Sequence, residues 1–453
     1  MGEKERIHKF YLNGMYIMLD INSGAVHVID KMIYDMMDIY DGTNGAEVVA
    51  KLSDRYEKTE LSEAVEELAG LIARQELFAP DLDVPPTFSD KPLVKSLCLH
   101  VAHDCNLRCK YCFAGTGDFG HDRSLMNKEV GEMAVDFIIA NSGQRKHCEL
   151  DFFGGEPLMN MPVVKHVVAY VRKREKETGK EFKLTLTTNG VLLNDANITY
   201  LNDNNISLVL SLDGRKEVHD NMRPNVAGKG SYDGILANFK KLVKARNGQN
   251  YFLRGTFTAY NLDFTTDVLD MADQGFDLLS VEPVVAKDCD YELKEAHLPK
   301  LYEEYERLAK EFIDRKEAGN GFEFFHFNMD INNGPCVAKR LSGCGAGHEY
   351  FAVAPNGDLY PCHQFVGRDQ YRLGTIFDGV TKKEMPEQFR QAHVLNKPEC
   401  SRCWARFYCS GGCHANADLF NGDIKKPYEI GCKLQKKRME CALMIQAYLA
   451  LQK

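Results

Sequence analysis

The chain has 453 residues, of which 44% are hydrophobic and 27% are charged, and its length suggests about three domains. Its net charge of −9 at pH 7 argues against a nucleic-acid backbone as a partner. No apolar run reaches the roughly 18 residues that a membrane helix needs, and the first residues lack the apolar core of a signal peptide. We therefore expect a cytoplasmic protein that binds neither nucleic acid nor membrane.

Residues 1–79 are predicted to form a small separate domain. Short strands are expected at residues 7–12, 15–20 and 25–29, because turn signals such as Asn13-Gly14 lie between them. Two or three helices follow, one of them over residues 61–75 with an apolar face. Residues 80–95 contain four prolines and are predicted to be a semi-rigid linker.

Strand and helix patterns alternate between residues 96 and 297. Six strand–helix repeats are typical of parallel β/α architectures, so we expect an α/β fold with a partial (β/α)6 barrel. Polar motifs follow five of the six strands, at the strand ends where β/α barrels collect their chemistry. Two further helices are expected at residues 298–318 and 433–451. The predicted barrel strands are residues 97–101, 149–153, 183–187, 207–212, 252–257 and 278–281.

Three cysteines follow the first of these strands with the spacing C-x3-C-x2-C: Cys105, Cys109 and Cys112. Thiolates are the normal ligands of iron–sulfur clusters, and three of them can hold a cubane while its fourth iron stays open to another ligand. Zinc is the alternative, but a structural zinc site needs four ligands. No fourth Cys or His lies at a suitable spacing nearby, and His103 and His121 are the closest candidates.

This spacing, with Tyr111 before the last cysteine, resembles the signature of the radical S-adenosylmethionine (SAM) enzymes. The resemblance implies that Cys105, Cys109 and Cys112 hold a catalytic [4Fe–4S] cluster and that SAM binds its open iron. One-electron cleavage of SAM would give a 5′-deoxyadenosyl radical, which abstracts a hydrogen atom from the substrate.

The resemblance also implies a set of SAM contacts at the ends of the following strands. Gly154-Gly155-Glu156 would meet the amino group, since glycine lets a backbone approach a ligand closely. An arginine fork suits the SAM carboxylate, although Arg223 could instead form an ordinary surface salt bridge. Tyr111 is expected against the adenine, or simply packed in the barrel mouth. The implied SAM-binding residues are Tyr111, Gly154, Gly155, Glu156, Thr188, Asn189, Ser211 and Arg223.

Fifteen cysteines occur in the chain, and most fall in two places. Disulfides are improbable in a reducing compartment, so metal or cluster ligation is the better interpretation. Cys98 and Cys148 are expected to be buried core thiols instead. No role is assigned to Cys289 or Cys441.

The second cysteine group resembles the SPASM pattern, which holds two auxiliary [4Fe–4S] clusters. Its central part is Cys400-x2-Cys403-x5-Cys409-x3-Cys413. Zinc is again the alternative. The inner cluster would have either Cys336 as its last ligand or an open iron. The resemblance assigns Cys400, Cys403, Cys409 and Cys432 to an outer cluster and Cys344, Cys362 and Cys413 to the inner one.

At the level of the whole chain, residues 1–79 resemble the winged-helix-like, PqqD-like domains that recognise leader peptides, with a dimerisation or capping domain as the alternative. The string from Cys105 to His121 resembles the maturases of six-cysteine (SCIFF) ribosomal peptides. The implied domains are residues 1–79 for leader recognition, 80–95 as linker, 96–297 as radical SAM barrel, 298–335 as linker helix region and 336–453 as SPASM domain.

Those maturases are of the sactipeptide type and join a cysteine sulfur to a carbon of another residue. The resemblance implies SAM and three [4Fe–4S] clusters as cofactors. Its implied partners are a Cys-rich ribosomal precursor peptide with a leader and a small electron donor of the ferredoxin or flavodoxin type. A sulfatase maturase that makes formylglycine, a quinohemoprotein-type crosslinking enzyme and a non-catalytic electron-transfer or peptide-chaperone subunit stay open as alternatives.

Overall fold

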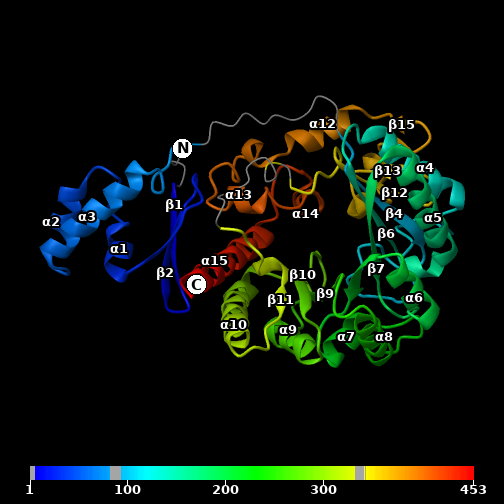
Figure 1. The fold of residues 1–453 in the computed structure, drawn as a ribbon, viewed down its shortest axis with the longest axis horizontal. Coiled ribbons are helices and arrows are strands. Elements are labelled where there is room, and N and C mark those ends of the chain that lie inside the picture. The colour runs from blue at the N-terminus through cyan, green and yellow to red at the C-terminus, as the bar shows by residue number, and fades with distance from the viewer. Residues whose placement is uncertain (1–5, 82–92, 332–340, 342, 453) are drawn as a thin grey trace.

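The computed structural model describes residues 6–81, 93–331, 341 and 343–452 (Figure 1). Cys336 and most of the predicted linker at 80–95 lie outside the described residues. No helix in the described ranges is long and apolar enough to cross a membrane.

The first unit is a three-stranded antiparallel sheet followed by three helices (Figure 1). Its two faces pack differently: Phe10, Ile17 and Leu19 join the largest hydrophobic core, whereas Met18 faces the unit's own helices. The long C-terminal helix packs against the first and third strands. The elements are β1 (Ile7–Leu12), β2 (Met15–Asp20), β3 (Val26–Ile29), α1 (Lys31–Met36), α2 (Gly45–Leu52) and α3 (Lys58–Ala73).

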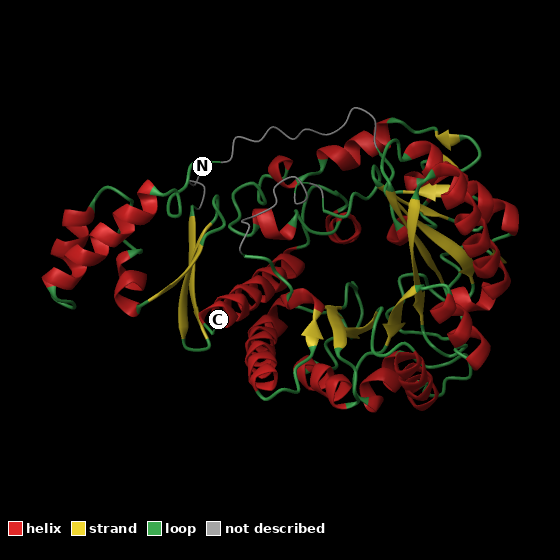
Figure 2. Cartoon of the chain, in the orientation of Figure 1, coloured by secondary structure: helices red, strands yellow, loops and turns green. Residues whose placement is uncertain are grey.

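All six predicted barrel strands are present and parallel, in the order β10-β9-β8-β7-β6-β4. Helices cover the outer face of this curved sheet (Figure 2). The strands are β4 (Ser96–His103), β6 (His147–Gly154), β7 (Glu181–Thr188), β8 (Ser207–Ser211), β9 (Tyr251–Phe257) and β10 (Leu278–Pro283). The helices are α4 (Lys128–Asn141), α5 (Met161–Thr178), α6 (Asp195–Asp203), α7 (Lys216–Met222), α8 (Tyr232–Ala245) and α9 (Phe264–Asp273).

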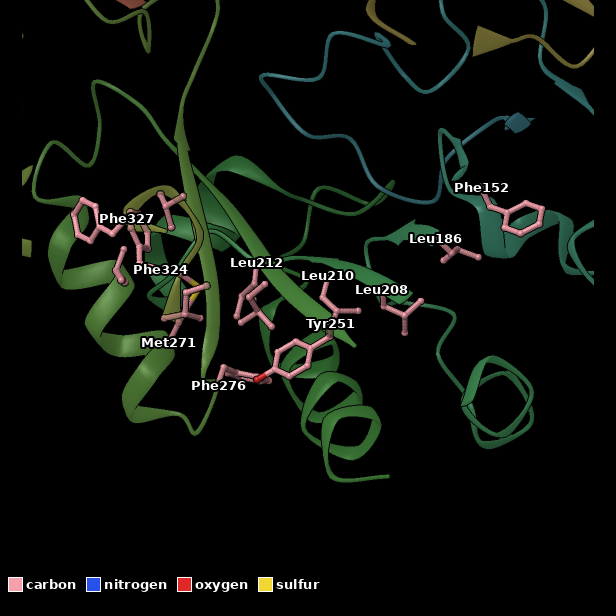
Figure 3. Close-up of a cluster of buried hydrophobic side chains, with 14 of the residues drawn as sticks. Phe152, Leu186, Leu208, Leu210, Leu212, Tyr251, Met271, Phe276, Phe324 and Phe327 are labelled. Atoms are coloured by element: carbon pink, nitrogen blue, oxygen red, sulfur yellow. The ribbon is translucent and has the colours of Figure 1, made fainter. Parts of the chain in front are cut away.

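Apolar side chains that alternate along these strands point toward the helices and are buried. Figure 3 shows part of this core, with aliphatic residues of β7 and β8 beside aromatic residues from the neighbouring elements. Opposite-facing residues of the same strands, such as Thr185 and Arg254, are only partly buried or exposed. The face of the barrel sheet that packs against the helices is therefore apolar, and the face toward the barrel interior is more polar. The side chains labelled in Figure 3 are Phe152, Leu186, Leu208, Leu210, Leu212, Tyr251, Met271, Phe276, Phe324 and Phe327.

The sheet does not stop at the barrel. β4 also pairs in parallel with β12, and three further short strands continue from there into the cysteine-rich C-terminal part. This continuous sheet joins two units that the sequence treats as separate. The additional strands are β5 (Ser124–Leu125), β11 (Glu323–Phe324), β12 (Tyr350–Val353), β13 (Asp358–Tyr360), β14 (Gly374–Thr375) and β15 (Gly379–Val380).

The two helices predicted after the barrel are both present and pack against each other: α10 (Leu298–Glu317) and α15 (Glu429–Leu451). Short helices between them carry the cysteine-rich loops. They are α12 (Glu384–Gln391), α13 (Arg406–Cys409) and α14 (His414–Asn421). Single turns of 3-10 helix lie at Pro157–Asn160, Glu295–His297, Phe325–Phe327, His363–Phe365, Asp369–Tyr371 and Val394–Asn396.

Candidate functional site

The loop that carries Cys105, Cys109 and Cys112 leaves the carboxyl end of β4 and is fastened to the segment after α7. Arg108 N donates to Pro224 O at 2.8 Å, and Lys110 N donates to Met222 O at 2.9 Å. Because Arg223 lies between these two acceptors, the loop and the predicted carboxylate-binding arginine have a fixed relation to each other.

The three cysteines of this loop are partly buried and lie near enough for their sulfurs to interact. Burial raises the pKa of Cys105 to about 12 and that of Cys109 to about 11. Such thiols stay protonated on their own, and coordination to a metal would deprotonate them. Nowhere in the described residues do three His, Cys, Asp or Glu side chains converge as ligands of a single metal ion.

Gly154 and Gly155 lie directly against the cysteine loop. A Cβ atom on Gly154 would come within 2.2 Å of Ala102 O, and one on Gly155 within 2.2 Å of Asp104 O. Gly154 also has a φ of +126°, which favours glycine strongly. We expected these glycines to let a ligand approach closely. In the structure, the backbone that approaches them closely is that of the cysteine loop and the end of β4.

Glu156 is buried and connects the Gly154-Gly155-Glu156 segment to Thr188 and Asn189, two other residues that are predicted to contact SAM. It accepts hydrogen bonds from Thr188 Oγ1 at 2.8 Å, Asn189 N at 2.8 Å and Leu158 N at 3.0 Å. Burial outweighs these donors and raises the pKa of Glu156 to about 7. A carboxylate has about four acceptor positions, so one is left for a further donor such as an ammonium group. Asn189 Nδ2 in turn points at Cys105 Sγ at 3.6 Å.

Arg223 is buried, which removes the alternative of a surface salt bridge. Its Nε donates to Asp213 Oδ2 at 3.0 Å, and its guanidinium lies 5.3 Å from the centre of the Tyr111 ring. Tyr111 donates its hydroxyl proton to the same Asp213 oxygen at 2.5 Å. The buried Asp213 therefore organises two of the predicted SAM contacts. Ser211 ends β8 two residues before it.

Asp213 is not among the SAM-binding residues predicted from the sequence. Its partners are 10 and 102 residues away, so no local pattern reveals them. The available signal was weaker: an acidic residue at a strand end, within reach of a predicted functional arginine.

The C-terminal cysteines form two groups. Cys400, Cys403, Cys409 and Cys432 line one cavity of about 440 Å³, which α13 and α15 help to enclose. These are the four thiols assigned to the outer cluster, so the donor set and the space both fit such a group. Burial raises the pKa of Cys400 to about 11 and that of Cys432 to about 12.

The second group contains Cys344, Cys362 and Cys413. Ionised Cys344 and Cys413 would each raise the pKa of the Cys362 thiol. The three predicted inner ligands therefore lie near one another. The choice between Cys336 and an open iron stays a prediction. Cys98 and Cys148 are buried, as expected for core thiols, and Cys441 is buried within α15.

Glu282, at the end of β10, links the barrel to the cysteine-rich part. Its carboxylate lies 3.0 Å from Arg438 of α15 and 3.2 Å from His326. Burial opposes ionisation of Glu282, but Arg438 and His326 outweigh it and lower its pKa to about 2. Arg438 also lies near enough to Cys409 for their charges to interact. A partly buried ion pair thus joins the two candidate cofactor regions.

Comparison with known proteins agrees with this geometry. Residues 99–258 match the model of the radical SAM superfamily, and residues 344–404 match that of the SPASM iron–sulfur cluster-binding domain. The chain is a radical SAM enzyme with a SPASM domain. Its cofactors are SAM and [4Fe–4S] clusters.

The chain is similar to two curated proteins and to one solved structure, among others. A cysteine-type anaerobic sulfatase-maturating enzyme of Clostridium novyi is 25% identical over 70% of this chain and 86% of its own length. The subtilosin biosynthesis protein AlbA of Bacillus subtilis is 24% identical over 71% and 68%. The structure of anSMEcpe with bound AdoMet and Cp18Cys peptide has a TM-score of 0.64 and 22% identity, and covers 80% of this chain and 100% of that chain.

Replacing Asp213 with asparagine should weaken SAM binding by about tenfold or more, because losing one partner of a buried ion pair typically costs 2–5 kcal/mol. Equilibrium dialysis of the cluster-loaded enzyme with SAM measures this. Asp233→Asn, which removes an exposed partner of Lys216, is the control and should bind SAM normally. Equal affinity of Asp213→Asn and wild type would contradict the organising role of Asp213.

Proposed function

We propose that the enzyme forms thioether crosslinks between cysteine sulfurs and carbon atoms in a ribosomally synthesised, Cys-rich precursor peptide, as the SCIFF maturases do. One observation supports this proposal: a three-stranded sheet and three helices precede the part of the chain that matches the radical SAM model. The anSMEcpe structure leaves about a fifth of this chain uncovered, and the β1–α3 unit is of similar size. We infer that this unit recognises the leader of a precursor.

The chain's own residues support a peptide-modifying role at the barrel mouth. When bound, SAM and its cluster supply hydrogen-atom abstraction. Asp213 holds Arg223 and Tyr111, and Glu156 holds the strand end at Thr188 and Asn189, so a bound SAM would meet a preorganised site. The three cysteines of the loop would hold the first cluster, and the two C-terminal groups would hold the auxiliary clusters.

The relatives leave a second candidate, a sulfatase maturase that converts cysteine or serine to formylglycine. The curated match to a sulfatase-maturating enzyme favours it. AlbA, which is named for subtilosin biosynthesis, is similar over nearly the same share of this chain and favours peptide crosslinking. Both candidates act on peptides or proteins, and a product analysis separates them.

Reconstituted enzyme should hold about twelve irons, four for each of three clusters. Cys109→Ala should lower this to about eight and abolish formation of 5′-deoxyadenosine, because the SAM-binding iron site is lost. Iron analysis and chromatography of the nucleoside product measure both. Cys148→Ala, which removes a buried thiol of β6, is the control and should keep all irons. SAM cleavage by Cys109→Ala at the wild-type rate would refute the site assignment.

The product decides the function. Incubation with a Cys-rich precursor encoded beside the gene should give peptide lighter by two hydrogen atoms for each crosslink, with the bridging cysteine no longer alkylatable. Mass spectrometry before and after alkylation measures this. A sulfatase peptide should remain unchanged under the same conditions. Conversion of its cysteine to an aldehyde, with no change in the precursor, would establish the second candidate instead.

Leader recognition is expected at an open edge of the N-terminal sheet, by addition of a peptide strand. Hydrogen bonds alternate along an antiparallel pair. Because Asp20 N donates to Ala25 O, the N–H of Val28 points away from β2 and toward the outer edge of β3. By the same alternation from the Ile21 N–Arg6 O bond, the N–H of Tyr11 points to the outer edge of β1. Val28 and Tyr11 are both exposed.

Proline at the edge that is used should weaken precursor binding by about tenfold, since it removes a donor and its ring obstructs the added strand. We expect Val28→Pro or Tyr11→Pro to show this in fluorescence anisotropy with labelled leader peptide, while Val28→Ala and Tyr11→Ala do not. Normal binding by both proline variants would exclude strand addition. Deletion of the domain is a poorer test, because its sheet shares a core with α15.

A further inference from the structure

Lys397 is a buried cation that has no role in the proposed SAM site or among the proposed cluster ligands. Its side chain is fully buried, and its Nζ donates to Gly411 O at 2.8 Å. No carboxylate of the described residues forms an ion pair with it, whereas the buried Arg223 pairs with Asp213. A buried ammonium group without a counter-charge is strongly unfavourable.

The surroundings of Lys397 are cysteines of both C-terminal groups. Gly411, which accepts its hydrogen bond, lines the outer cavity and lies midway between Cys409 and Cys413 in the sequence. Lys397 itself precedes Cys400 by three residues. The cysteines near enough for their sulfurs, once ionised, to interact with its ammonium group are Cys400, Cys409, Cys413 and Cys432. Three of these belong to the outer group and one to the inner group.

This placement identifies the missing counter-charge. Neutral thiols cannot balance a buried ammonium group, whereas thiolates that ligate a cluster carry the negative charge that it needs. The reduction potential of an iron–sulfur cluster depends on net charge, on nearby hydrogen bonds and on solvent exposure. A cation held out of water near the ligand cysteines of both clusters would favour the state with one more electron in each of them, since solvent screens it little.

We propose that Lys397 is a positioning residue whose ammonium group is the shared counter-charge of the two auxiliary clusters and holds their reduction potentials up. The inference rests on the ligand sets given under the proposed function. It does not depend on which peptide is modified. Addition of one electron to a cluster is the only change involved, and no bond is formed or broken.

Lys397→Met tests the proposal, because methionine keeps an unbranched apolar side chain and removes the charge. We expect both auxiliary clusters to shift to more negative midpoint potentials in redox titrations of the fully loaded enzyme followed by electron paramagnetic resonance, without substrate. The cluster at Cys105 should not shift. Lys426→Met is the matched control: Lys426 lines the same cavity but is exposed, so water screens its charge and the potentials should stay in place.

Lys397→Arg should keep the wild-type potentials, because it keeps the charge. If Lys397→Met loses only auxiliary iron while Lys397→Arg keeps it, the counter-charge role is supported. Unchanged potentials in fully loaded Lys397→Met overturn the proposal, as do equal shifts in Lys426→Met. Loss of auxiliary iron from both Lys397 variants also overturns it and makes Lys397 a packing residue. Because no substrate is present, failure to crosslink a precursor leaves this result untouched.

Discussion

The close approach of the cysteine loop to the backbone of Gly154 and Gly155 is the constraint on which the site depends. Gly155 N donates to Ala102 O at 2.8 Å and Glu156 N donates to Asp104 O at 2.9 Å, so the loop lies directly on the end of β6. Any Cβ at these positions would collide with backbone rather than with a movable side chain. The contact fixes Cys105 relative to Glu156, and Glu156 in turn fixes the end of β7. The two glycines therefore determine how the cysteine loop is placed relative to the predicted SAM-binding residues.

A second constraint joins the three units of the chain, and its centre is α15. This helix carries Cys432, pairs with the barrel through Arg438 and Glu282, and packs on the N-terminal sheet. The ring of His8 from β1 stacks on Trp404 at 3.9 Å, in the loop of the outer cysteines, and bonds to Glu440 of α15 at 3.0 Å. A leader peptide bound to the N-terminal sheet would therefore sit on a scaffold continuous with the outer cysteine group. The domains suggested by the sequence are not mechanically independent.

Much of the barrel and the grouping of the cysteines could be predicted, because both depend on local spacing. Alternating apolar residues identify all six barrel strands, and the C-x3-C-x2-C run is a single loop. Contacts between distant segments could not be predicted, because local spacing does not reveal them. Asp213, for example, meets Tyr111 and Arg223 only once the chain has folded. The strands β12 to β15 were missed because they have two to four residues each, too few to show a period. Their pairing with β4 is a tertiary effect.

The cofactor sites themselves cannot distinguish a peptide crosslinking enzyme from a sulfatase maturase, since the radical SAM and SPASM units serve relatives named for different activities. Selectivity must come from surfaces that touch the peptide. The barrel interior offers one, where Arg254 of β9 is exposed and lies near enough to Glu282 and to His363, which follows Cys362, for their charges to interact. Glu282 is already held by Arg438 and His326, so under the proposed function the exposed Arg254 would be available to donate to a peptide carbonyl. Under the proposed function, the N-terminal sheet would be the other such surface, and its distance from the barrel interior would set which part of a precursor reaches the radical.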